Sequence, residues 1–244
     1  MTSVIYKDVP YYVAGNEGSK VGIIVIQEWW GLNNHIKNMT ARFAKELDAL
    51  AITPDLYRGK VATAADEANH LMGSLDWPNA IVDVKNACEY LKEKGCEKIG
   101  ITGFCMGGAL TIASAVHVPA ITAGSCFYGI PPAQLANPAE IKIPIQFHFG
   151  DKDMSPGFSD IKAADDLKEV LTKAGKLSVS QVRHDNGAYA PIERKKGAKI
   201  AEFHRYTNGN HAFMNEEAPA YPFDPELSKL AMKHTTEFFK TYLQ

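Results

Sequence analysis

Short runs that are apolar on both faces recur along the chain, and they constrain its fold more than any other feature. The run "VGIIVI" (21–26) has no polar position, and "EKIGITGF" (97–104), "AGSCFYG" (123–129) and "IPIQFHFG" (143–150) are further predicted strands rich in apolar residues. A strand of this kind needs protein on both faces, which is typical of parallel sheets covered by helices. Each run has strand length, well short of the ~18 apolar residues of a membrane-spanning helix.

Segments with helical spacing of apolar residues alternate with these strands. We expect helices at 35–50, 63–73, 77–94, 107–117 and 159–174, and a last one from Asp224, as cap, and Pro225 to about 242. Further strands are expected at 51–57, 176–183 and 201–206. This order predicts an α/β protein with a mostly parallel central sheet, helices on both faces, and a single domain over residues 1–244.

Charge and composition exclude several classes of function. A formal net charge of −2 leaves no electrostatic footprint for nucleic acid or an anionic membrane. The first ten residues lack a basic segment followed by an apolar one, so we expect no secretory signal and a cytoplasmic location. None of the four cysteines forms a C-x-x-C pair, which argues against zinc ribbons and thioredoxin-like motifs.

One cysteine stands where a predicted strand becomes a predicted helix. The segment "GFCMG" (103–107) follows the G-x-S-x-G pattern with Cys105 in place of serine, and Gly108 comes next. In that pattern the nucleophile sits on a strained strand-to-helix turn, and a helix N-terminus stabilises an anion there. The alternative is that Cys105 is a packed core residue, which is the commoner role of an isolated cysteine.

A nucleophilic thiol needs a base and a group that orients the base. In α/β-hydrolases the chain order is nucleophile, acid, histidine. Asp151 and Asp153 both follow the strand at 143–150, and His211 lies in "YTNGNHAFMN" (206–215) after three turn residues. The order is therefore satisfied by Cys105, either aspartate, and His211.

The other histidines have no pair with metal-ligand spacing, so the sequence predicts no metal site. His148 is expected to pack within its strand, and helical histidines such as His234 to be partly exposed. His184 and His204 flank the polar stretch "HDNGAYAPIERKKGAK" (184–199), which we interpret as an exposed loop or excursion. No cofactor is expected.

With these residues in place, the chain resembles the dienelactone hydrolase family of the α/β-hydrolase superfamily over nearly its whole length. The resemblance rests on "QEWWGLN" (27–33), "TPDLYRG" (53–59), "GFCMGG" (103–108), "HFGDKDMSP" (148–156) and "GNHAF" (209–213). It implies an α/β-hydrolase fold.

The resemblance also implies a catalytic triad of Cys105, Asp153 and His211. It favours Asp153 over Asp151 because the family's acid stands three residues after a glycine, which is Gly150 here.

Five further positions match the family's site. Glu28 matches a glutamate that lies beside the nucleophile and controls its protonation, although a glutamate after a strand can also be a simple surface cap. The backbone N–H groups of Trp29 and Met106 match an oxyanion hole. Trp30 and Tyr128 match the substrate pocket, although either tryptophan indole can simply pack.

This sequence departs from the family members that cleave dienelactones. Those members hold the substrate carboxylate with two arginines, but Asn215 stands four residues after His211, and residues 60–80 contain no arginine. Arg58 and Arg205 are nearby in the sequence, but the sequence alone does not show where their side chains lie. The basic residues of 184–199 and the adjoining Arg183 either replace the missing cations or are solvated.

These features predict a cysteine-dependent hydrolase of carboxylic esters or lactones that acts on a small molecule. A neutral or differently charged ester, a lactone or a thioester is the expected substrate. Two other classes stay open: a hydrolase-fold binding protein without catalysis, and a redox or thiol-transfer protein. The last would need a resolving cysteine near Cys105, and Cys88, Cys96 and Cys126 lack suitable spacing.

Overall fold

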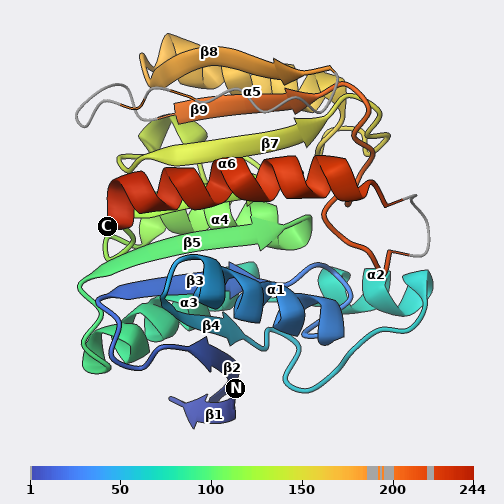
Figure 1. The fold of residues 1–244 in the computed structure, drawn as a ribbon. Helices are drawn as coiled ribbons and strands as arrows, with labels where there is room; N and C mark the ends of the chain where they lie inside the picture. Colours follow the sequence, from blue (N-terminus) through green and yellow to red (C-terminus); the bar gives the residue numbers. More distant parts are fainter. Residues whose placement is uncertain (1, 186–191, 193, 195–200, 219–222) are drawn as a thin grey trace.

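A nine-stranded sheet runs through the molecule, in the order β1-β2-β4-β3-β5-β6-β7-β9-β8 (Figure 1). The computed structural model describes residues 2–185, 192, 194, 201–218 and 223–244. The strands are β1 (Thr2–Tyr6), β2 (Val9–Gly15), β3 (Val21–Ile26), β4 (Leu50–Pro54), β5 (Lys98–Phe104), β6 (Ala123–Phe127), β7 (Ile145–Gly150), β8 (Leu177–His184) and β9 (Ala201–Tyr206). Strands β3 to β9 pair in parallel, which confirms the predicted sheet.

The antiparallel hairpin β1–β2 at one edge of the sheet was not predicted. Its first strand is mostly exposed, so it lacks the apolar run that marks the central strands. Lys7 and Asp8 both have positive φ, 49° and 63°, at its turn. This is the backbone of a tight hairpin turn, but the sequence there lacks the usual Asn-Gly or Asp-Gly signal.

Helices cover both faces of the sheet, as predicted. They are α1 (Asn34–Glu46), α2 (Ala65–Gly73), α3 (Trp77–Glu93), α4 (Met106–His117), α5 (Ile161–Lys173) and α6 (Pro225–Leu243), with a 3₁₀ turn η1 (Pro138–Glu140). Figure 1 shows α1 and α6 on one face, and α3, α4 and α5 on the other. The Asp224 side chain accepts a hydrogen bond from the backbone N–H of Leu227, which confirms it as the cap of α6.

Alternate residues of the central strands face two separate apolar cores. In β3, Ile23 and Val25 pack into the core under α1 and α6, whereas Ile24 and Ile26 pack into the core under α3 and α4. This is why β3 is apolar at every position: both of its faces are buried. None of the described helices is long and apolar enough to cross a membrane.

The carboxyl ends of the parallel strands meet at one edge of the sheet, where ligands bind in folds of this type. The segments that follow β3, β5, β6, β7 and β9 therefore come together there, on the right in Figure 1. Most of the polar stretch 184–199 lies outside the described residues, and so does the prediction that it forms an exposed excursion.

Helix α6 holds its face of the sheet through buried aromatic side chains. Phe239 is fully buried and its ring contacts Phe43 of α1. We expect Phe239→Ala to lower the free energy of unfolding by about 3–5 kcal/mol, because it removes a large buried side chain and leaves a cavity. Phe223→Ala, at a residue with 36% of its surface exposed, is the matched control. Urea unfolding followed by circular dichroism measures both, and equal losses would contradict this packing.

Candidate active site

The backbone between β5 and α4 is strained at a single residue. Cys105 has φ 55° and ψ −117°, and it separates Phe104, the last residue of β5, from Met106, the first residue of α4. A non-glycine residue in this region costs free energy, which tight packing around it must offset. The turn points the Cys105 thiol into a cavity at the carboxyl edge of the sheet.

Glycines make this turn possible because the main chain crowds it from several sides. A Cβ atom on Gly103 would lie 2.2 Å from the carbonyl oxygen of Gly107, and one on Gly108 would lie 2.2 Å from that of Phe127. A Cβ atom on Gly129 would lie 2.0 Å from the Cys105 carbonyl oxygen. These distances explain the glycines of the motif physically: no side chain fits.

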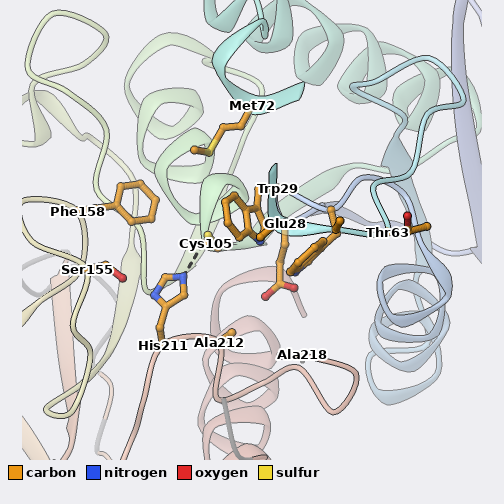
Figure 2. A pocket seen from close by; sticks show the side chains of 13 residues that line it. Glu28, Trp29, Thr63, Met72, Cys105, Ser155, Phe158, His211, Ala212 and Ala218 are labelled. Carbon is orange, nitrogen blue, oxygen red and sulfur yellow. Dashed lines mark hydrogen bonds between the residues drawn. The ribbon is translucent and has the colours of Figure 1, made fainter. Parts of the chain in front are cut away.

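His211 links the thiol to a carboxylate. Its Nε2 atom lies 3.2 Å from Cys105 Sγ (Figure 2), and its Nδ1 atom lies 2.8 Å from Asp153 Oδ2. Ser159 Oγ also lies 3.1 Å from His211 Nδ1, a contact that no sequence pattern indicated. The Ser155 N–H donates to the other Asp153 oxygen at 3.0 Å. The structure thus brings together the three side chains that the sequence analysis named as a triad.

Asp151, the other candidate acid, faces away from His211. It forms ion pairs with Arg205 at 2.6 Å and Arg183 at 2.7 Å. Only Lys152 lies between the two aspartates in the loop after β7, yet Asp151 pairs with arginines and Asp153 contacts His211.

The Asp153–His211 pair is electrostatically coupled. Burial opposes ionisation of both groups, but their mutual hydrogen bond and charge outweigh it. The pKa of Asp153 is therefore held below its usual value, with help from Ser159 and Ser155. The pKa of His211 is raised well above 6.5 by its hydrogen bonds and by the charges of Asp153 and Cys105. These hydrogen bonds and charges therefore favour the protonated form of His211, next to the Cys105 sulfur.

Glu28, which follows β3, is buried beside this constellation. It is 1% exposed, its Oε2 atom accepts a hydrogen bond from the Asn215 side-chain amide, and Tyr128 Oη lies 3.4 Å from Oε1. Burial raises the pKa of Glu28 to about 7, against the charge of His211 and the two hydrogen bonds, which lower it. Glu28 is therefore no surface cap, and it titrates near neutral pH.

Two backbone segments meet at the turn that holds Cys105. Met106 is the first residue of α4, so its N–H has no acceptor within the helix. Trp29 comes from the segment after β3, which packs closely on the start of α4: a Cβ atom on Gly107 would lie 2.5 Å from the Ile26 carbonyl oxygen. The structure places the two predicted oxyanion donors on adjoining segments at the same edge.

A cavity of about 470 Å³ opens onto Cys105 and His211. Its walls are mostly apolar, and Figure 2 shows the Trp29 indole beside Cys105. The lining residues are Glu28, Trp29, Trp30, Thr63, Ala64, Ala65, Met72, Cys105, Ser155, Phe158, His211, Ala212 and Ala218. Trp30 lines the cavity as predicted, whereas Tyr128 lies behind it, against Glu28 and the His211 ring.

Within the described part of the chain, no lysine or arginine lines this cavity. The arginines that the sequence left unplaced pair elsewhere: Arg58 with Asp83, Arg183 and Arg205 with Asp151, and Arg194 with Glu202. Asn215, at the position of a missing family arginine, is held against Glu28. The sequence analysis singled out Asn215 because it replaces a family arginine, but it did not indicate the hydrogen bond from Asn215 to Glu28.

The fold and the site define the class of this protein. A mostly parallel sheet with helices on both faces, a strained turn with Cys105 after β5, and an aspartate and a histidine after later strands are the features of an α/β-hydrolase.

Comparison with known proteins narrows this class to a family. The pattern of the Dienelactone hydrolase family matches residues 9–187. The chain therefore belongs to the dienelactone hydrolase family and, with it, to the carboxylic-ester hydrolases.

Individual relatives are similar to this protein over most of the length of both chains. The protein usf of Aquifex pyrophilus is 33% identical, over 95% of this chain and 93% of its own. A protein of Aquifex aeolicus (strain VF5), provisionally named a carboxymethylenebutenolidase, is 28% identical over 96% and 93% of the two chains. A crystal structure from Klebsiella pneumoniae, provisionally described as a dienelactone hydrolase, shares the fold with a TM-score of 0.75 at 22% identity, covering 96% and 93%.

Glu28 predicts a pH-dependent contribution to stability. Between the ordinary pKa of about 4.5 and the folded value of about 7, the folded chain keeps a proton that the unfolded chain releases. The free energy of unfolding therefore falls as pH rises through this window, by about 1.4 kcal/mol per pH unit. In Glu28→Gln this loss is absent.

We expect the stability of Glu28→Gln relative to wild type to rise by about 2–3 kcal/mol from pH 5 to pH 8. Urea unfolding of both proteins across this range measures it, and other titrating groups cancel in the difference. A difference that stays constant with pH would show that Glu28 ionises normally.

Proposed function

We propose that this protein is a cysteine-dependent hydrolase of small carboxylic esters or lactones, with Cys105 as nucleophile, His211 as acid and base, and Asp153 as the residue that orients His211. One observation carries the proposal. The His211 imidazole lies 3.2 Å from Cys105 Sγ and 2.8 Å from Asp153, where the thiol opens onto an apolar cavity.

Each step of the reaction has a group in place. The Cys105 thiolate attacks the carbonyl carbon, and the N–H groups of Met106 and Trp29 stabilise the oxyanion, at roughly 3–4 kcal/mol per donor. His211 then gives its proton to the leaving oxygen as the C–O bond breaks and a thioester forms. Water attacks the thioester while His211 takes its proton, and the collapse of the second tetrahedral intermediate expels the thiolate.

Glu28 has a supporting part in this mechanism. Its carboxyl group lines the same cavity and has a pKa of about 7. Glu28 can therefore hold or release a proton near Cys105 before substrate binds. Asn215 and Tyr128 fix its orientation through hydrogen bonds. We assign Glu28 the control of the charge around Cys105.

The cavity favours neutral, apolar substrates. Trp29, Trp30, Met72 and Phe158 form much of its wall, and its described lining has no lysine or arginine to bind a substrate carboxylate. An anionic substrate would also meet Glu28, which is partly ionised at neutral pH. We therefore expect a lower kcat/KM for dienelactones, which carry a carboxylate, than for neutral esters and lactones. A thioester would react by the same steps and is the second candidate.

The other functional classes fit the site less well. A binding protein without catalysis would not need a histidine and an acid aligned on the thiol. A thiol-transfer protein would need a second reactive cysteine, but burial raises the pKa of Cys88 to about 12 and of Cys96 to about 11, and raises that of Cys126 further. All four cysteines are free thiols, which suits the cytoplasmic location expected from the sequence.

Matched aspartate variants test the triad. We expect Asp153→Asn to lower kcat on a neutral aryl ester by roughly 10²–10⁴-fold, because His211 loses its orienting acceptor. Asp151→Asn, two residues away, removes an ion pair of the buried Arg205 and should reduce stability while kcat stays within a few-fold. Steady-state kinetics on folded protein measure both. If Asp151→Asn were the inactive variant, the assigned acid would be wrong.

A matched pair of substrates tests the charge preference. We expect kcat/KM for 4-nitrophenyl butyrate to exceed that for 4-nitrophenyl hydrogen succinate, which has a similar acyl chain ending in a carboxylate. The reason is that the described lining is mostly apolar and has no lysine or arginine. Initial rates at pH 7.5 measure the ratio, and a higher kcat/KM for the anionic ester would mean that a cation reaches the cavity.

A further inference from the structure

Three buried histidines meet at the far side of the sheet from the β1–β2 edge. His184 ends β8, His204 lies in β9, and His234 lies on the inner side of α6. A nitrogen atom from each lies within 4.8 Å of the nitrogen atoms of the other two. We propose that His184, His204 and His234 bind one divalent transition-metal ion, Zn²⁺ or a close analogue, that ties β8 and β9 to α6.

The sequence could not indicate this site. Twenty residues separate His184 from His204 and thirty separate His204 from His234, so no short ligand spacing exists. The expectation that His234 is partly exposed was wrong: it is fully buried, because this side of α6 faces the sheet. The parallel pairing of β8 with β9 and the packing of α6 over them bring the three rings together.

The spacing of the nitrogen atoms suits a tetrahedral ion. His184 Nε2 lies 3.1 Å from His204 Nδ1, close to the ~3.3 Å expected between two nitrogens that each lie ~2.05 Å from one zinc ion. The His234 ring lies 4.8 Å, centroid to centroid, from each of the other two rings and is tilted against both. Metal binding requires the His184 and His204 rings, which now face each other through this contact, to rotate so that both nitrogens point toward a shared centre.

A carboxylate behind His204 completes the arrangement. Glu202 Oε2 lies 3.5 Å from His204 Nε2, the ring nitrogen opposite the proposed ion. Carboxylates in this position fix the tautomer of a metal-bound histidine and raise its basicity. Arg194 holds Glu202 through two hydrogen bonds of 2.8 and 3.1 Å, so the charge of the carboxylate is balanced and its orientation fixed.

The site is distinct from the catalytic cysteine. A row of neighbouring rings crosses the sheet from His184 to His204, His148, Phe127 and Phe104, with centroids 5.4, 4.7, 4.3 and 5.0 Å apart in that order. The metal site lies at one end of this row and Cys105 follows the residue at the other end. We therefore assign the ion a structural role at the β8–β9 end of the sheet rather than a step in ester hydrolysis.

The test begins with the full-length Cys105→Ala protein, because Cys105 and His211 are themselves potential metal ligands. We expect it to bind one Co²⁺ or Zn²⁺ per chain in a saturable titration, and Co²⁺ to give the intense visible absorption of four-coordinate geometry. X-ray absorption of the zinc form should show imidazole nitrogens at ~2.0–2.1 Å. No saturable binding, or a spectrum without imidazole ligands, would overturn the proposal.

Variants in the same background assign the ligands. We expect His234→Gln to weaken Zn²⁺ binding by at least the ~10–100-fold that is typical for losing a ligand's hydrogen-bond partner. His117→Gln, at an exposed histidine, is the control and should bind as tightly as its parent. Unchanged affinity in His234→Gln would overturn the assignment. If this variant does not fold, X-ray absorption of the parent still decides whether histidines bind the ion.

Discussion

The left-handed backbone at Cys105 is the constraint on which the rest of the site depends. Its φ of 55° is tolerated because β3, β6 and α4 enclose the turn and because glycines at 103, 107, 108 and 129 let their main chains touch. The same close approach that enforces the strain brings the segment after β3, with Glu28 and Trp29, against the start of α4. Strain, oxyanion donors and the buried carboxyl group are therefore consequences of one packing arrangement.

Burial and neighbouring groups together set the pKa values of Asp153, His211 and Glu28 in this site. The hydrogen bond and opposite charges of Asp153 and His211 hold the pKa of Asp153 below its usual value and raise that of His211. Burial raises the pKa of Glu28 to about 7, although the charge of His211 and the hydrogen bonds of Asn215 and Tyr128 oppose this rise. The described lining of the cavity has no lysine or arginine, and together with Glu28 this is the basis of the expected preference for neutral substrates.

Much of this molecule could be predicted from its sequence, because the relevant signals are local. The strands apolar on both faces, the helix cap at Asp224, and the glycines around Cys105 each follow from neighbouring residues. Other features depend on contacts that local patterns do not encode. Separating Asp153 from Asp151 needed the family resemblance, and the position of Tyr128 behind the cavity and the meeting of His184 with His234 needed the assembled sheet. The β1–β2 hairpin was missed because a half-exposed edge strand carries little apolar signal.

The central claim is that Cys105 attacks the substrate. Rapid acid quench of wild-type protein during turnover of an activated neutral ester, followed by mass spectrometry of its peptides, tests this most directly. The account predicts the added mass of the acyl group on the peptide that contains Cys105, formed before steady state and absent from Cys105→Ala. Acylation of another residue, or steady turnover by Cys105→Ala at the wild-type rate, would contradict it.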